Sequence, residues 1–184
     1  MTDKKVYVFL AEGFEVTEAL STVDVLRRAH LDVTTVSISS SLEVMSSNQI
    51  LVTADRLFTD GTLSDADAIV LPGGMPGTLN MEQFIPLISL IKDYYKAGKI
   101  IAAICAAPSI LGHLGLLHGE EAIAYPGFEE SLSGASVSNK SVVRSHQFIT
   151  ARGMGVSQQF ALKIIETLID NQTASQVASA AIIE

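Results

Sequence analysis

The sequence predicts an α/β protein with a mostly parallel central sheet and helices on both of its faces. Short strand-like runs alternate along the chain with segments of helical periodicity, which is the pattern of such a sheet. The runs "KVYVFLA", "DAIVLP" and "KIIAAIC" are apolar enough to be buried strands. No linker, repeat or low-complexity tract interrupts the 184 residues, so we expect one domain over residues 1–184.

The elements can be assigned in order from these patterns. We expect strands at 5–11, 31–38, 67–72 and 99–105, short strands or a hairpin within 41–58, and short β segments at 121–126, 135–138, 141–145 and 147–151. We expect helices at 15–29, 80–98, 106–119 and 155–170, followed by a short helical tail. Pro86 marks a candidate start within the second helix, and Gly119 closes the third.

Composition excludes several classes of function. The net charge is −8 and no Lys/Arg cluster is longer than a pair, which argues against nucleic-acid binding. The apolar stretch 100–117 approaches the length of a membrane span, but Pro108, two glycines and His113 favour a buried strand and helix. One cysteine excludes an intrachain disulfide, and the first residues lack a signal-type apolar region. We therefore expect a cytoplasmic protein.

The single cysteine, Cys105, lies where a strand turns into a helix. A side chain on such a turn is held up like the serine of a nucleophile elbow, and the helix that follows favours a thiolate. The alternative is an inert buried residue, since cysteine is among the most buried residue types. In a parallel sheet the carboxyl ends of the strands form the ligand crevice, so we expect 12–18, 72–77, 105–106 and 125–130 to converge.

The glycines and acidic residues in these segments each allow a functional and a purely structural interpretation. Gly73 and Gly74 follow a strand and could present N–H groups to an oxyanion, or form a plain turn. Glu15 and Glu18 share a face at a helix start, where acidic residues are ordinary. A Glu18 side chain facing the cysteine would instead hold a proton and shuttle it.

Other candidate residues point less clearly to chemistry. The segment "ARGMG", residues 151–155 of which Arg152 is the cation, could cradle an anion, but it reads more simply as a turn and cap. The four histidines read as surface or turn residues rather than bases. With one cysteine and scattered histidines, no metal-ligand spacing is present, and no cofactor motif appears.

Taken together, the motifs resemble the ThiJ/PfpI superfamily, most closely its DJ-one branch of Parkinson-associated protein deglycase-like proteins. The resemblance rests on "LAEGFEVTEALSTVDVLRRA", "DAIVLPGGMPGTLN", "IAAICAAPSIL", "AYPGFEE" and "ITARGMGVSQQFALKIIE", and it covers nearly the whole chain in order. It implies a flavodoxin-like three-layer α/β sandwich, similar to class I glutamine amidotransferases, and a homodimer.

The resemblance also implies roles for particular residues. Cys105 would be the nucleophile, and Glu18 the protonated acid that touches its sulfur. The backbone of Gly73, Gly74 and Ala106 would bind an oxyanion, with Glu15 and Tyr125 also at the substrate. Members of the family are described as glutathione-independent glyoxalases and as deglycases acting on methylglyoxal or its adducts with proteins and nucleotides.

Three positions depart from patterns within the family. Peptidase-type relatives have a histidine where this chain has Ala106, which argues against a Cys–His peptidase. The deglycase pattern has a histidine at Tyr125, whose phenol is a poor base at neutral pH. Some members place a dimer-interface arginine at Asn48.

Three hypotheses follow, in order. The first is a Cys105–Glu18 enzyme acting on small reactive aldehydes or glycated protein or nucleotide, without cofactor. The second is a cysteine-based sensor of oxidative stress, or a chaperone, with little turnover. The third is an α/β domain whose cysteine is inert.

Overall fold

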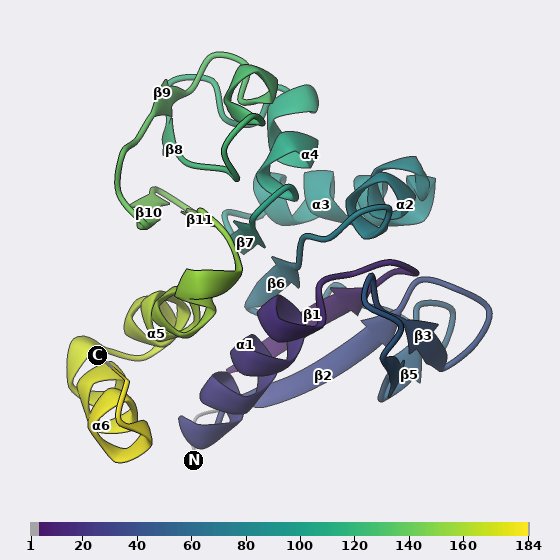
Figure 1. Cartoon of the computed structure of the whole chain (residues 1–184), viewed down its shortest axis with the longest axis horizontal. Coiled ribbons are helices and arrows are strands. Elements are labelled where there is room, and N and C mark those ends of the chain that lie inside the picture. Colours follow the sequence, from purple (N-terminus) through teal and green to yellow (C-terminus); the bar gives the residue numbers. More distant parts are fainter. Residues whose placement is uncertain (1–3, 184) are drawn as a thin grey trace.

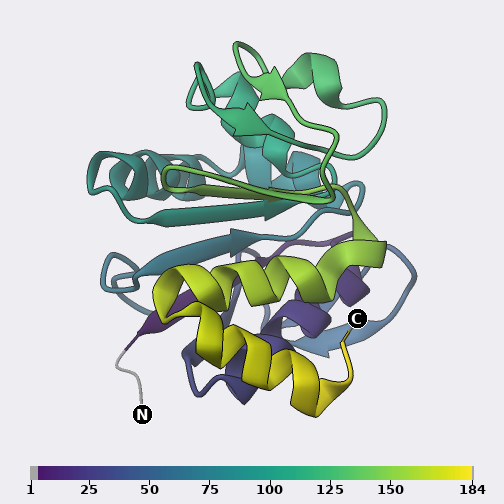
Figure 2. The ribbon, with the colours of Figure 1, turned by 90° about the vertical axis from the view of Figure 1, so that its left-hand side faces the viewer.

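A computed structural model describes residues 4–183 and shows three layers, with one large sheet between two groups of helices (Figure 1; Figure 2). The sheet has seven strands in the order β10-β11-β7-β6-β1-β2-β5. Their bounds are β1 Lys5–Leu10, β2 Asp32–Ser37, β5 Arg56–Leu57, β6 Ala68–Leu71, β7 Ile100–Ile104, β10 Val142–Ser145 and β11 Phe148–Ala151. All neighbours pair in parallel except β10 and β11, so the predicted mostly parallel sheet is confirmed.

The helices divide between the two faces. They are α1 Val16–Arg28, α2 Gly77–Gln83, α3 Ile85–Lys96, α4 Pro108–His113, α5 Ser157–Leu168 and α6 Asn171–Ala181. Successive strand residues point to opposite faces, as the pleat requires. Val6, Val8 and Leu10 join the core under α1, α5 and α6, whereas Tyr7 and Phe9 join the core under α2, α3 and α4. Because both faces are covered, β6 and β7 are apolar at every position, and β1 carries a charge only at its first residue, Lys5.

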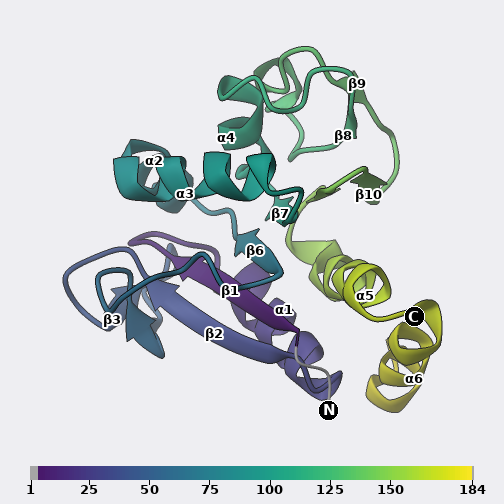
Figure 3. The same ribbon diagram turned by 180° about the vertical axis from the view of Figure 1, so that it is seen from behind.

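Smaller elements lie at the edges of the sandwich. Strands β3 Glu43–Met45 and β4 Leu51–Thr53 form an antiparallel hairpin, and β8 Glu121–Ala122 pairs in parallel with β9 Ser136–Val137. Two 3-10 turns, η1 Glu129–Ser131 and η2 Met154–Val156, complete the described elements. The β8–β9 pair and α4 lie at the end of the molecule away from α6 (Figure 3).

Two predicted helices differ from the structure. The segment 80–98 contains two helices, because the chain leaves helical geometry at Phe84, which closes α2 and precedes α3. Pro86 lies in the first turn of α3, where its missing N–H costs nothing. The helix expected over 106–119 is only α4, and turns follow it through two positive-φ glycines, Gly115 and Gly119. In the region 41–58, the hairpin stands apart and only β5 joins the main sheet.

Candidate functional site

The chain turns sharply at Cys105, directly after β7. Its backbone φ is 64°, a left-handed conformation that costs a non-glycine residue about 1–3 kcal/mol. Two backbone hydrogen bonds hold it there: Cys105 N–H donates to the Ala151 carbonyl (2.9 Å), and the Cys105 carbonyl accepts from Tyr125 N–H (2.8 Å). The side chain is partly buried. The predicted elbow is therefore present, and neighbouring segments fix its geometry.

Glu18 lies in the first turn of α1 and is almost completely buried, with 1% of its surface exposed. Gly73 N–H donates to its Oε2 at 2.8 Å. Its other oxygen, Oε1, is buried and has no hydrogen-bond partner among residues 4–183. The carboxyl group as a whole interacts with the Cys105 side chain. No ion pair of the described chain includes this carboxyl. A buried carboxyl without a cation is costly to ionise, so this side chain needs an explanation beyond packing.

The glycine pair after β6 brings these groups together. A Cβ on Gly73 would lie 2.6 Å from Cys105 Cβ and 2.8 Å from Glu18 Oε2, so only glycine fits between them. Gly74 has φ +91° and continues the turn. The N–H groups of Gly74 and Ala106 interact with the Cys105 sulfur. Gly73 N–H donates to Glu18 in this structure, so Gly74 and Ala106 supply the amide groups that interact with the sulfur. Oxyanion binding by these three residues stays a prediction.

Burial raises the pKa of Glu18 from 4.5 to about 7. The hydrogen bond from Gly73 and the interaction with Cys105 pull it down, and the nearby Glu15 charge pushes it up. A carboxyl with this pKa exchanges its proton readily near neutral pH, which suits a group that moves protons.

Burial also raises the pKa of the Cys105 thiol, to about 12, and the neighbouring Glu18 carboxylate adds to the shift. The N–H groups of Ala106 and Gly74 oppose it. This direction is opposite to the one expected from the helix that follows, because burial and the Glu18 charge outweigh the N–H groups of Ala106 and Gly74. The thiol is therefore the weaker acid of the two, and the Glu18 carboxylate is the base beside it.

The four predicted strand-end segments do converge. Glu15 N–H donates to the Gly73 carbonyl (2.9 Å), Gly77 N–H donates to the Gly13 carbonyl (3.1 Å), and Tyr125 binds Cys105 as described. The Glu15 side chain is the N-cap of α1, accepting from Thr17 N–H at 3.2 Å, which is its ordinary helix-start role. Glu15 Oε2 also accepts from Ser47 Oγ at 3.3 Å. Ser47, in the β3–β4 turn, carries no motif that could have placed it here.

Tyr125 has half of its surface exposed and stands at the mouth of the site. Its ring packs against Gly153, where a Cβ would lie 3.2 Å from Tyr125 Cδ2. An open cavity of about 370 Å³ borders it, lined by residues 125–126 and 152–156. The histidines lie elsewhere in local contacts, such as His113 with Glu82 (2.6 Å). His146 is in the β10–β11 turn as expected, where it contacts Glu120 at 2.7 Å.

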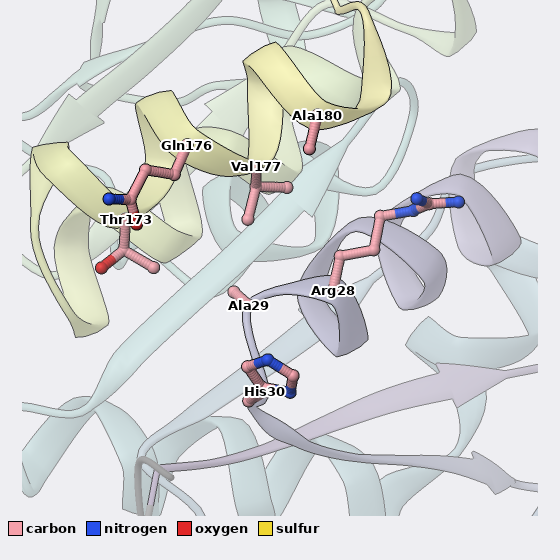
Figure 4. A pocket seen from close by; sticks show the side chains of 7 residues that line it. All are labelled: Arg28, Ala29, His30, Thr173, Gln176, Val177 and Ala180. Atoms are coloured by element: carbon pink, nitrogen blue, oxygen red, sulfur yellow. The ribbon is translucent and has the colours of Figure 1, made fainter.

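A second open cavity, of about 350 Å³, lies between the end of α1 and α6. Figure 4 shows Thr173, Gln176 and Val177 on one side of it and Ala29 and His30 on the other. It is at the amino ends of the strands, because α1 leads into the start of β2 there. It contains no thiol or carboxyl group, so the strand-end site is the better candidate.

The described residues include neither a metal-ligand cluster nor a membrane-spanning helix. Residues 4–183 contain no group of three or more His, Cys, Asp or Glu side chains placed to hold a metal ion. None of their helices is long and apolar enough to span a bilayer. The stretch 100–117 is the strand β7 followed by the short helix α4, as expected.

The fold and this geometry define a class: a parallel α/β protein with a cysteine on a strained strand–helix turn and a buried carboxyl beside it. The model of the DJ-1/PfpI family matches residues 4–167, and the chain belongs to this family. The resemblance read from the motifs is thus confirmed, and so is the fold class.

Individual DJ-1 relatives are similar to this chain in both sequence and structure. The chain is 37% identical to protein DJ-1 homolog B of Arabidopsis thaliana over 95% of its own length, and 34% identical to protein dj-1beta of Drosophila melanogaster over 95% of both chains. It spans 40% and 46% of the length of the two Arabidopsis relatives, homologs B and A. A structure titled Toxoplasma gondii DJ-1, oxidized, superposes with a TM-score of 0.94 at 36% identity, covering 97% of this chain and 98% of that one. The Drosophila DJ-1beta crystal structure also gives 0.94, at 32% identity over the whole of both chains.

Proposed function

We propose that this protein is a cysteine-dependent glyoxalase or deglycase that acts on methylglyoxal or its adducts. One observation carries the proposal: the buried Glu18 carboxyl lies beside Cys105, and no cation among residues 4–183 pairs with it. A nucleophile with an adjacent base, itself oriented by a third group, is the usual arrangement for covalent catalysis. Here the third group is Gly73 N–H, which fixes Glu18 Oε2.

The first step is attack of the sulfur on the aldehyde carbon. Glu18 takes the thiol proton as the C–S bond forms, and the aldehyde oxygen becomes an alkoxide. Gly74 and Ala106 N–H, which face the sulfur, are positioned to donate to that oxygen. The product of this step is a hemithioacetal on Cys105 once the alkoxide is protonated.

Glu18 then moves a proton between two carbons of the bound intermediate. It removes the proton from the former aldehyde carbon and returns a proton to the neighbouring ketone carbon, while the hydroxyl proton of the hemithioacetal passes to the ketone oxygen. The result is a lactoyl thioester on Cys105. Water breaks the C–S bond, and the sulfur recovers its proton. The sum is methylglyoxal plus water giving lactate and a proton, with no external oxidant or reductant.

The decisive experiment follows lactate formation from methylglyoxal without glutathione. Lactate must be measured rather than aldehyde loss, because any thiol or amine consumes the aldehyde. Cys105→Ser and Glu18→Gln should abolish turnover, whereas Asp24→Asn, an exposed carboxylate on the same helix, should leave it unchanged. Absence of lactate from the wild-type protein would refute the aldehyde mechanism for this substrate.

The second candidate is a redox sensor in which peroxide oxidises Cys105 to a sulfenic or sulfinic acid. It is favoured by one comparison: the Toxoplasma gondii relative is titled as oxidized. Intact-mass measurement after peroxide treatment of folded protein tests it, and a gain of one or two oxygens without lactate turnover would favour the sensor. No change in mass and no alkylation before unfolding would favour an inert cysteine.

We also propose that the protein acts as a homodimer, as the family resemblance implies. The β3–β4 hairpin contacts the loop before α1 through Gly13 N–H and the Met45 carbonyl (2.8 Å), so a partner that covers this hairpin would lie close to Glu15. Met45 and Leu51 on the hairpin are exposed apolar side chains. Sedimentation of the purified chain gives the oligomeric state, and a monomer at micromolar concentration would overturn this proposal.

A further inference from the structure

The cavity beside Tyr125 has features that the chemistry at Cys105 leaves unused. Its rim carries two exposed side chains, Tyr125 (51% exposed) and Met154 (53% exposed), and its walls include Pro126 and Val156. A volume of about 370 Å³ is in the range of small-molecule sites. The walls are mainly apolar, which suits the body of a small organic group.

Backbone hydrogen bonds tie both walls of this cavity to the reactive turn. One wall begins at Tyr125, whose N–H donates to the Cys105 carbonyl at 2.8 Å. The other begins at Arg152, directly after Ala151, whose carbonyl accepts from Cys105 N–H at 2.9 Å. The cavity therefore adjoins Cys105, and its position relative to the sulfur is fixed by the β7 and β11 strand ends.

One charged residue lines the cavity: Arg152, an exposed residue directly after β11. Among the described residues this side chain has no ion pair and no hydrogen-bond partner, whereas Arg27 and Arg28 are both paired with aspartates. None of the lining residues is acidic. Glu129 is an acidic residue that comes soon after Tyr125 and Pro126 in the chain. Its carboxylate accepts a hydrogen bond from Gly127 N–H at 2.6 Å and forms no ion pair with Arg152 in the described chain. An exposed arginine without an ion-pair partner among residues 4–183, at the edge of a mainly apolar cavity, has a small anion as its complementary ligand.

We propose that this cavity is a subsite for a carboxylate or phosphate carried by the aldehyde or adduct that reacts at Cys105. The inference rests on the proposed function and narrows its substrate class to anionic compounds. Arg152 binds the oxyanion, and the Tyr125 and Met154 side chains cover the apolar atoms between it and the reacting carbon. Methylglyoxal, which is neutral, would fill only the part of the site nearest the sulfur.

Alkylation of Cys105 tests the subsite without relying on lactate turnover. Two matched pairs of reagents differ in charge and reach: iodoacetate with iodoacetamide, and 3-maleimidopropionate with N-ethylmaleimide. Because Cys105 is the only cysteine, intact mass gives each rate directly, and rates with free N-acetylcysteine correct for intrinsic reactivity. We expect at least one anionic reagent to be preferred by about 10-fold at low salt, with a smaller preference at high salt.

Substitutions of two arginines distinguish anion binding at Arg152 from a general effect of the protein's charge on anionic reagents. Arg152→Gln should remove the preference, Arg152→Lys should keep part of it, and Arg144→Gln, an exposed arginine on β10, should leave it intact. Slower alkylation by iodoacetamide in the presence of inorganic phosphate or of acetate identifies which oxyanion is bound. No preference in either pair, or a preference that survives Arg152→Gln, overturns the subsite and leaves the lactate assay to decide the proposed function. A Cys105 that none of the four reagents alkylates in the folded protein overturns both.

Discussion

The two ends of the central sheet treat their carboxyl groups in opposite ways. At the amino end, Asp65 accepts hydrogen bonds from Lys5 Nζ and Tyr7 Oη, each 2.7 Å long, and Asp67 binds Lys4 at 2.8 Å. At the carboxyl end, Glu18 in α1 is buried, and no cation of the described chain pairs with it. All three are carboxyl groups near a strand end, so their surroundings make the difference.

The pKa values of Asp65 and Glu18 shift in opposite directions. Hydrogen bonds from Lys5 and Tyr7 lower the pKa of Asp65 to about 2, whereas burial raises that of Glu18 to about 7. At pH values above the range in which carboxyl groups ordinarily titrate, a lowered carboxyl pKa stabilises the folded state and a raised carboxyl pKa destabilises it. The amino end is thus built for stability, while the carboxyl end tolerates an unfavourable charge that is useful for chemistry.

The largest expected effect concerns reactivity. In the wild type, the rate of Cys105 alkylation by iodoacetamide should rise with pH and level off above about pH 7, where Glu18 is free to accept the thiol proton. Glu18→Gln should lower the rate near pH 7.5 by about 10²–10⁴-fold and make it rise above pH 8, because only the thiol then titrates. An identical profile in the two proteins would remove Glu18 from the mechanism.

The second effect is on folding. Glu18 has a raised pKa, so the stability it provides is complete below pH 4.5 and is lost as pH rises through about 7. Glu18→Gln should therefore stabilise the protein by about 3 kcal/mol at pH 8 and by less than about 1 kcal/mol at pH 5. Urea unfolding at the two pH values measures this, with Asp24→Asn as a control that should show no such difference. A destabilised variant at pH 8 would contradict the prediction.

The third effect tests the close contact at the glycine pair. Gly73→Ala puts a methyl group 2.6 Å from Cys105 Cβ, so the site must move apart at a cost of about 1–3 kcal/mol. Gly155→Ala is the matched control, because nothing lies within 4 Å of its Cβ position, and it should change stability by less than about 0.5 kcal/mol. Equal urea midpoints for the two variants would argue against the contact.

The smallest effect lies at the amino end. Asp65→Asn should destabilise the protein by at most about 1 kcal/mol at pH 7, because the ion pair is half exposed and screened by solvent. The lowered pKa means that this difference should disappear as pH falls from about 4 through 2. Thermal unfolding at pH 7 and pH 2.5 measures it, and its sign should be opposite to that of Glu18→Gln.

Much of the fold could be read from local patterns. The apolar runs of β1, β6 and β7 and the helical periodicity of α1 and α5 predicted their elements, because burial on both faces of a sheet or on one face of a helix leaves a repeating signature. Pro86 is a candidate helix start in the sequence, and α3 confirms it, because proline is favoured in the first turn of a helix. The short α4 could not be predicted in the same way. Its length depends on where the chain meets its neighbours, as when Gly112 in α4 packs directly against the backbone of Ser131.

The sequence by itself determined the class of fold and the family. It also predicted Cys105 and Glu18 as the two groups at the site, because strand ends converge in any parallel sheet. Only the tertiary structure decided the surroundings of those groups. The hydrogen bond from Gly73 N–H to Glu18, the upward pKa shift of Cys105 and the place of Arg152 beside the Tyr125 cavity arise between segments far apart in the chain. Hydrogen bonding, desolvation and charge pairing depend on distances in space, which residue spacing along a sequence does not contain.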